Sequence, residues 1–370
     1  MALLWMDSFD HYVTADIVKK WTNLGTQGSG TTTIGAFGRH SSQGIRHATT
    51  SANASSKPTL KVVSPTSPIA IVGFGFQTNS FATAGSASAG TIGVWDRGQS
   101  GGNGCACLLF IMNGNLVQGA FTLVNGTGQI RYYRADGTLV WTSTGSLGMN
   151  VFQFLEFKIT LSPTVGTIDV IRDGVALSAP ATGLNTGLAA AWSGFVLGRC
   201  ESNVSVSMNW DFDDVYVCDG AGSAPWNTFL GDCRVDVRVP TAEGTTIGWT
   251  PLSGSDNALM VDEALDNGDT DYNATSTLDA IDTFVVQDAP IPGAAIYGVQ
   301  HVLNMKKADA GVCTVAPVIR HSTTDYPGTA LSPSMTYAPL TQVQPTNPGT
   351  AAQWIEADFN AAEFGYKRVS

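Results

Sequence analysis

Three carboxylates lie within four positions of the segment WDFDDVYVCDG, residues 210–220. Paired carboxylates can hydrolyse glycosidic bonds when roughly 5 to 9.5 Å separates them across a cleft and burial raises the pKa of one. In an extended strand Asp211 and Asp213 share a face and Asp214 lies opposite, so the three groups do not converge. We therefore predict that they are a structural signature of the strand that closes a sheet. They would cap the entrance of that strand and hydrogen-bond nearby loop amides.

A second acidic segment, DNGDTDYN at residues 266–273, contains oxygen ligands of the kind that Ca²⁺ prefers. The candidate ligands are Asp266, Asp269, Asp271 and Asn273. An EF-hand loop needs Asp-x-Asp-x-Asp-Gly followed by a Glu at its twelfth position, and this spacing matches neither requirement. We interpret the segment as a solvated turn and predict no metal ligand here, with calcium kept as an alternative hypothesis.

The remaining motifs indicate no catalytic chemistry. The five histidines are dispersed and form no HExxH pattern, and the sequence contains neither GxSxG nor a P-loop. They are His11, His40, His47, His301 and His321. The glycine-rich GQSGGNG, residues 98–104, precedes a strand-like segment, so it lacks the helix N-terminus that holds phosphate. We predict no catalytic residue and no cofactor.

Six cysteines are too few for a small disulfide scaffold, and they form no paired CxxC motif for zinc. They are Cys105, Cys107, Cys200, Cys218, Cys233 and Cys313. We interpret most of them as buried small apolar side chains. Cys218 and Cys233 flank the short, turn-rich GAGSAPWNTFLGD and form the candidate disulfide, provided that the protein reaches an oxidising environment.

The composition favours an all-β protein without a nucleic-acid partner. Hydrophobic residues make up 43% of the 370 residues and charged residues only 13%, with 41 Gly and 16 Pro. A sequence of this composition is poor in the charged residues that cover exposed helices. The net charge is −11 and the 19 basic residues are scattered, which argues against a nucleic-acid partner. No apolar stretch approaches the roughly 20 residues of a membrane helix, and MALLWMDSFD lacks the basic start of a signal peptide. We expect no membrane insertion and synthesis in the cytoplasm.

Short alternating segments separated by turn formers predict a sandwich, jelly roll or barrel. In VFQFLEFKITL, residues 151–161, Leu155, Phe157 and Ile159 share one face, and Glu156 and Lys158 the other, as in a half-buried strand. Asp-Gly pairs at 136–137 and 173–174 predict two-residue hairpin turns, because both turn positions need positive φ. Only residues 15–21 and 351–365 could hold short helices, and both are equally compatible with strand and loop.

The order of segments predicts three parts. DSFDHY near the start and WDFDDVYVCDG both combine aromatic residues with flanking Asp residues. This similarity is expected of first and last strands that lie side by side. This delimits a domain over residues 1–220. Residues 221–290 are rich in turn formers and predict an extended arm or linker. Residues 291–370 predict a smaller C-terminal β domain.

Two resemblances accompany these patterns. The order DSFDHY…KW, FLEFKITL…GTIDVIRDGVAL and WDFDDVYVCDG resembles a concanavalin A-like (laminin-G-like) jelly roll. The later segments FLGDCRVDVRVPTAEGTTIGWTP, SGSDNALMVDEALDNGDTDYNATSTLDAIDTFVV and PTNPGTAAQWIEADFNAAEFGYKRVS resemble virion structural proteins of tailed bacteriophages. The second resemblance implies a non-catalytic part of the virion: an exposed decoration, a collar or neck element, or a tail-associated protein. Its partners would be other virion proteins and symmetric copies of itself. Trp226 and Trp354 are candidate contact anchors.

Two alternatives remain at this point. The first is a glycan-binding module that contacts a host surface, with or without calcium, since jelly rolls resembling this one often bind sugars. The second is a glycosidase. Jelly-roll glycosidases carry a strand with a Glu-x-Asp-x-x-Glu pattern, and here Glu156 and Asp169 each offer one isolated acid. The missing pattern argues against hydrolysis.

Overall fold

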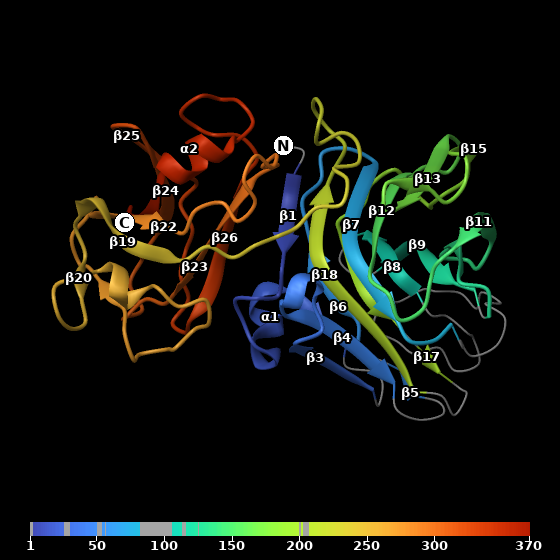
Figure 1. The fold of residues 1–370 in the computed structure, drawn as a ribbon, viewed down its shortest axis with the longest axis horizontal. Coiled ribbons are helices and arrows are strands. Elements are labelled where there is room, and N and C mark those ends of the chain that lie inside the picture. Colours follow the sequence, from blue (N-terminus) through green and yellow to red (C-terminus); the bar gives the residue numbers. More distant parts are fainter. Residues whose placement is uncertain are drawn as a thin grey trace. The chain divides into compact units, whose positions relative to one another are not determined.

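The chain folds into two compact units, which we examined in a computed structural model. The structure describes residues 3–25, 30–49, 54–55, 57–81, 106–112, 116–124, 126–199, 201–202 and 207–370. The first unit, here the jelly-roll unit, comprises Met1–Phe9 and Val13–Val235, and the C-terminal unit comprises Asp10–Tyr12 and Asp236–Ser370. Both are built from antiparallel strands, so the all-β prediction is confirmed (Figure 1).

The front sheet of the jelly-roll unit has the order β14-β13-β12-β7-β18-β4-β3, with β1 also on β18 and β15 also on β13. Its strands are β1 Leu3–Asp7, β3 Thr31–Gly35, β4 Gly44–Thr49, β7 Ile69–Thr78, β12 Gln153–Thr160, β13 Gly166–Arg172, β14 Val175–Ala176, β15 Ala181–Leu184 and β18 Met208–Cys218. The first and last strands of the unit are neighbours, with Asp7 opposite Val215. The pairing agrees with the side-by-side placement predicted for the first and last strands, but of DSFDHY only Asp7 lies in β1, which covers Leu3–Asp7.

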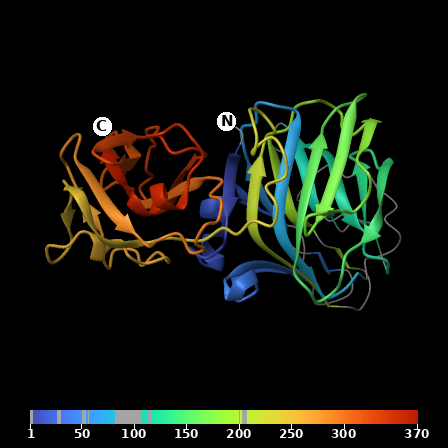
Figure 2. The same ribbon diagram turned by 45° about the horizontal axis from the view of Figure 1, so that its top comes forward.

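The back sheet has the order β11-β10-β9-β8-β16-β6-β2, and Figure 2 shows the two sheets of this unit as layers. Its strands are β2 Asn23–Leu24, β6 Thr59–Val62, β8 Ala106–Met112, β9 Leu116–Leu123, β10 Gln129–Arg134, β11 Leu139–Ser146 and β16 Gly194–Arg199. Aromatic side chains join the layers: the ring centroids of Phe157 and Phe121 lie 4.7 Å apart, and those of Trp5 and Phe195 5.9 Å apart. A short pair, β5 Ala54–Ser55 and β17 Glu201–Ser202, stands apart from both sheets.

One of the two predicted hairpin turns is confirmed and the other is corrected. Asp173 and Gly174 join β13 to β14 with φ of 50° and 76°, as a two-residue turn requires. Residues 135–138 instead form a four-residue connection between β10 and β11, in which Gly137 has a φ of 89°. The Asp136 carboxylate accepts a hydrogen bond from the Thr138 amide at 3.0 Å. This bond holds residues 136–138 in a local turn, so the connection is longer than the two residues predicted.

Short helices form in both segments for which the sequence allowed either a helix or strand and loop. In the first, a 3₁₀ turn over Thr14–Asp16 leads into α1, Ile17–Lys20, and in the second α2 covers Glu356–Ala361. Two more 3₁₀ turns cover Arg39–Ser41 and Ala258–Met260. In the described part of the chain no helix is long and apolar enough to cross a membrane.

The C-terminal unit contains a five-stranded sheet with the order β19-β22-β27-β24-β25, a ribbon of β23 and β26, and a short pair, β20 with β21. Its strands are β19 Pro240–Ile247, β20 Thr250–Pro251, β21 Asn273–Ala274, β22 Ile281–Val286, β23 Val299–Met305, β24 Val315–His321, β25 Thr324–Pro327, β26 Ala338–Gln344 and β27 Glu363–Arg368. Because β22 pairs with β27, with Phe284 opposite Phe364, residues 236–290 belong to this unit. The predicted arm over 221–290 is therefore wrong, and the first unit ends at Val235 instead of residue 220.

Two apolar clusters form the core of the C-terminal unit. One contains Ile319, Trp354, Phe359, Ala362 and Phe364, and the other Ala258, Phe284, Val315 and Tyr366. The ribbon covers both, because Val299 packs on the first cluster and Leu303 and Met305 on the second. Trp354 is 1% exposed, so the prediction of an anchor there is wrong, whereas Trp226 is half-buried.

Buried His301 makes the stability of the C-terminal unit sensitive to acid. The His301 ring packs 5.5 Å from Phe364, and neither ring nitrogen has a hydrogen-bond partner among the described residues. Burial lowers the pKa of His301 from 6.5 to about 4. Between those values the unfolded chain binds a proton that the folded chain does not, so stability falls as the pH drops. We expect a loss of about 3 kcal/mol by pH 4.

Amide hydrogen exchange across pH 7 to 4 checks this expectation, with His301→Phe as the test variant. In that variant the protection of β22, β24 and β27 should no longer fall with pH. His47, whose pKa burial lowers to about 3, leaves the jelly-roll unit acid-sensitive and serves as the internal control. An unchanged pH profile of the C-terminal unit in His301→Phe would contradict the assignment.

Candidate functional site

The acidic cluster, Asp211, Asp213 and Asp214, lies in the middle of β18 and not at a strand entrance. The pairing of β18 with β7 shifts register between Asp213 and Tyr216, and Asp214 has a φ of 52°, as at a β-bulge. The bulge breaks the strict alternation of faces. The prediction that Asp214 points away from Asp213 is therefore wrong, because both carboxylates reach Arg39.

Asp211 is paired with an arginine from the neighbouring strand β4. Arg46 lies opposite Asp211 and donates from Nε and Nη2 to its two carboxylate oxygens at 2.7 and 2.8 Å. The guanidinium also lies 3.8 Å from the ring centroid of Phe37. In this bidentate geometry both carboxylate oxygens of Asp211 accept a hydrogen bond from within the sheet.

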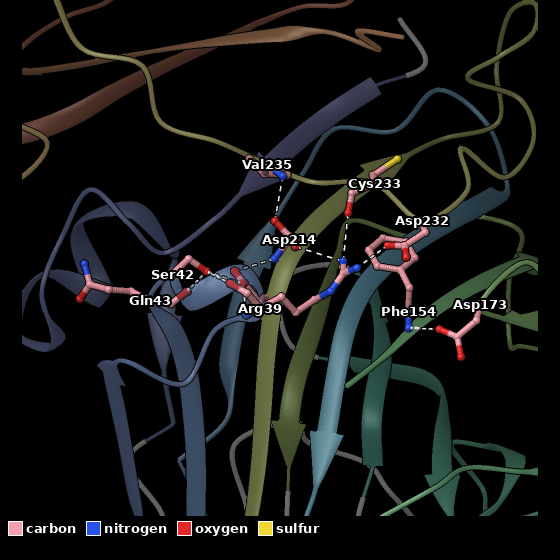
Figure 3. A network of polar contacts seen from close by, with 10 residues as sticks. Arg39, Ser42, Gln43, Phe154, Asp173, Asp214, Asp232, Cys233 and Val235 are labelled. Carbon is pink, nitrogen blue, oxygen red and sulfur yellow. Dashed lines mark hydrogen bonds and ion pairs between the residues drawn. The ribbon is translucent and has the colours of Figure 1, made fainter. Parts of the chain in front are cut away.

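Asp213 and Asp214 fasten two loops to β18. Asp213 accepts hydrogen bonds from the Arg39 amide at 2.7 Å, from Ser42 Oγ at 2.9 Å and from the Asp214 amide at 2.8 Å. Burial and the adjacent Asp214 carboxylate raise the pKa of Asp213. Asp214 accepts from Arg39 Nη1 at 3.1 Å and from the Val235 amide at 2.8 Å. Figure 3 shows this network around Arg39.

Arg39 is the centre of the cluster. Besides Asp214 it contacts Asp232 at 2.5 Å and the Cys233 carbonyl oxygen at 3.1 Å, and its guanidinium lies 5.0 Å from the ring of Phe154 (Figure 3). Its aliphatic stem lies directly on Gly75 of β7, where a Cβ atom would collide with Arg39 Cδ. The glycine is therefore needed for the arginine to cross the sheet.

Residues 219–235, here the covering segment, lie over the outer face of the front sheet. Lys158 Nζ donates to the Asn227 carbonyl oxygen at 3.0 Å, and the Leu230 amide donates to Tyr216 Oη at 3.2 Å. The Gly231 amide donates to Glu156 Oε1 at 2.9 Å. Together with the Arg39 and Asp214 contacts, these bonds hold the segment along most of its length.

Glu156 is fully buried beneath the covering segment, on the face of β12 predicted to be solvated. Its Oε1 accepts a short hydrogen bond from Tyr216, while Oε2 has no hydrogen-bond partner among the described residues. Burial raises the pKa of Glu156, and burial likewise raises the pKa of Asp169, which lies opposite Lys158 on β13. A hydrolase needs two acids across an open cleft, and Glu156 is covered instead.

The acidic segment at 266–273 uses its side chains in local contacts. Asp266 accepts from the Gly268 amide at 2.8 Å, and Asp269 binds Lys306 at 2.5 Å. Asp271 accepts a hydrogen bond from Asn267, and the Asn273 side-chain amide donates to the Asn257 carbonyl oxygen at 2.8 Å. Within the described ranges, no three His, Cys, Asp or Glu side chains are arranged to hold a metal ion.

Cys218 and Cys233 are free thiols in the structure, one at the end of β18 and one in the covering segment. Burial raises the pKa of both, and the charge of Cys233 contributes to the shift of Cys218. Their disulfide stays a prediction. Cys107 is a buried thiol, as expected, and Cys313 is half-buried. Cys105, Cys200 and the loop at 98–104 lie outside the described residues.

Sequence reasoning missed Arg39, Arg46, Ser42 and Tyr216, which complete the cluster. One signal could have indicated them: IAIVGFGFQT places Gly73 and Gly75 on one face of an otherwise bulky strand. Alternate glycines in a strand mark a close approach by another group. Tyr216 lies on Gly73 as Arg39 lies on Gly75.

Comparisons with known proteins assign no family. No family model and no curated protein match the sequence. Solved structures similar to this chain include the binding domain of botulinum neurotoxin serotype C1, with 7% identity, coverage of 93% of each chain and a TM-score of 0.37. Arcelin-5, a lectin-like defence protein from Phaseolus vulgaris, is 8% identical to this chain. The match covers 58% of this chain and 97% of arcelin-5, with a TM-score of 0.35. The lectin UEA-II complexed with galactose has 12% identity, coverage of 58% and 98%, and a TM-score of 0.32. Similarities this weak carry no functional conclusion, and the description of the fold rests on its own strand pairing.

Proposed function

We propose that this chain is a non-catalytic structural component of a tailed-phage particle, which assembles through contacts with copies of itself and with other virion proteins. The assignment to a phage particle follows from the sequence resemblance of residues 229–370. The structural observation that carries the non-catalytic part is the covering segment. It lies over the outer face of the front sheet and engages Glu156 and Asp214 in internal hydrogen bonds, while Asp213 is held by the Arg39 amide.

The exposed side chains favour protein contacts over sugar stacking. Every aromatic side chain in the described part of the chain is buried or half-buried. Aliphatic side chains are exposed in both units, among them Val165 at 68%, Val175 at 65%, Leu278 at 60% and Val312 at 85%. Scattered exposed aliphatics are common, but in a chain with only 13% charged residues they offer contact area to a partner subunit.

Immunogold labelling of purified phage particles tests the proposal. Particles released from a host that carries the gene should bind an antibody raised against the purified chain, at positions that repeat with the symmetry of the particle. Mass spectrometry of the same particles should find the protein in stoichiometric amounts. Unlabelled particles that lack the protein, together with calcium-dependent binding of the purified chain on a glycan array, would replace this proposal with the host-glycan alternative.

Glu156→Gln is the sharpest test of the non-catalytic part. Glutamine has the shape of the protonated acid that burial favours, so its Oε1 can keep the bonds from Tyr216 and Gly231. We expect unfolding free energies within about 1 kcal/mol of each other for the two proteins. Neither should release reducing ends from a panel of polysaccharides. Turnover by the wild type that is lost in Glu156→Gln, with the fold retained, would establish a glycosidase instead.

A further inference from the structure

An ion pair lies inside the jelly-roll unit, remote in sequence from the acidic cluster. Lys20 Nζ, at the end of α1, lies 2.9 Å from Asp7 Oδ1, at the end of β1. The two side chains are 1% and 0% exposed. Taking such a pair out of water costs several kcal/mol per ion, so a reaction that removes both charges is favoured at a dry site.

Two fixed donors hold the Asp7 carboxyl group in place. Trp21 Nε1 donates to Oδ2 at 2.9 Å, and the Phe9 amide donates to Oδ1 at 3.1 Å. Phe9 has a φ of 62°, a strained conformation for a bulky residue, directly beside this contact. Donors aimed at a carboxyl carbon's oxygens stabilise the oxyanion that forms when an amine attacks that carbon.

A second lysine completes the group. Lys61 Nζ donates to the Lys20 carbonyl oxygen at 2.7 Å and lies 4.9 Å from the ring centroid of Trp5, and Lys20 Nζ lies 5.9 Å from the same ring. Burial lowers the pKa of Lys61 to about 8, and Lys20 adds to this effect by repulsion. Part of the Lys61 population is therefore neutral near pH 8 and able to accept a proton.

From this geometry we propose that Lys20 and Asp7 condense spontaneously to an intramolecular amide, a covalent cross-link between α1 and β1. The Lys20 ammonium first transfers one proton to Asp7 Oδ1, which lies 2.9 Å from Nζ. The neutral Nζ, held beside the carboxyl group by its contact with Oδ1, then attacks Cγ. Lys61 takes the second Nζ proton and returns it to Oδ1. The Cγ–Oδ1 bond breaks and Oδ1 leaves as water, while Oδ2 remains as the amide oxygen bonded to Trp21.

No oxidant or cofactor enters this reaction, and its only by-product is one water molecule. The surrounding Trp5, Phe9 and Trp21 are buried, which keeps water from reversing the step. The product also removes two buried charges. An amide bond within the fold would suit a protein that must resist mechanical load, but the inference stands independently of the proposed function.

Intact mass spectrometry of the purified full-length chain, after incubation at pH 8, tests the proposal. We expect a mass lower by one water than the sequence requires, and a digest with a linked peptide joining the segments around residues 7 and 20. Lys20→Arg keeps the charge but not the nucleophile and should show no loss. Asp7→Asn should form the same amide with loss of ammonia in place of water.

Two pairs in the same protein serve as matched controls. Lys306 and Asp269 lie 2.5 Å apart, and Lys19 and Asp16 2.9 Å apart, but these side chains are 19% to 65% exposed. Neither pair should be linked. The proposal would be overturned if the wild type kept its unmodified intact mass at pH 8. It would also be overturned if Lys20→Arg lost the mass of one water as the wild type does, or if the exposed pairs were linked.

Discussion

Replacing Arg39 by alanine should lower the unfolding free energy of the jelly-roll unit by about 3–5 kcal/mol, the usual cost of removing one partner of a buried ion pair. The substitution leaves Asp214, 4% exposed, without its guanidinium and beside buried Asp213. It also removes the bond to the Cys233 carbonyl oxygen that fastens the covering segment. Urea unfolding gives the free energy. Amide exchange over residues 219–235 should accelerate before the sheets open.

Arg46→Ala is the matched control for this prediction. Arg46 also pairs with an acid of the same strand, but its side chain is 29% exposed, against 10% for Arg39. Asp211 itself is 6% exposed, but the space that Arg46 leaves opens to solvent, so the loss should be smaller than in Arg39→Ala. Exchange in the covering segment should be unchanged in Arg46→Ala. Equal losses in the two variants would show that the cluster does not hold the segment.

Replacing Trp354 by alanine should remove about 3–5 kcal/mol from the C-terminal unit, as expected for a large aromatic side chain in a core. Trp354 packs on Phe359 and Phe364 at 6.4 and 6.2 Å between ring centroids, and its Nε1 donates to the Gln344 carbonyl oxygen at 3.1 Å. Because only two small clusters form this core, the loss should unfold much of the population. Protection from amide exchange should vanish in β22, β24 and β27.

In Trp354→Ala the amides of β7, β12 and β18 should keep their protection, because they belong to the other unit. Trp226→Ala is the comparison variant, since Trp226 is half-buried in the covering segment and has no place in the C-terminal core. It should leave β22, β24 and β27 unchanged. Wild-type protection of those strands in Trp354→Ala would mean that the second unit does not depend on this core.

The sequence predicted side-chain burial correctly on the core-facing side of a strand in which apolar and polar residues alternate. The alternation of Leu155, Phe157 and Ile159 predicted the core face of β12 correctly, and all three are fully buried. The opposite face was predicted to be solvated, yet Glu156 is buried too. Its cover comes from residues 219–235, and alternation within a strand carries no information about a segment that folds over it from far along the chain.

The sequence identified the acidic residues of the cluster on β18 but not how their side chains are arranged. The acidic residues of β18 were identified as structural, and their contacts agree with that interpretation. A bulge then placed Asp213 and Asp214 around one arginine, although strict alternation separates them. The C-terminal unit was divided wrongly for a related reason: β19 and β22 are short and separated by 33 residues of turns and short elements, from 248 to 280. The polar strand β19, PTAEGTTI, carries almost no apolar pattern that would indicate its distant partner β22.

The position of β18 between β7 and β4 governs how the jelly-roll unit can be synthesised. The strand made last fills the middle of the front sheet, so every ribosome-bound chain shorter than about 218 residues holds that sheet as two separated halves with open edges. Such edges invite pairing with other chains. Completion must wait until translation has passed β18, which makes folding of this unit late, non-local and slow. A premature stop codon upstream of β18 would yield an aggregation-prone fragment with open strand edges instead of a smaller sandwich.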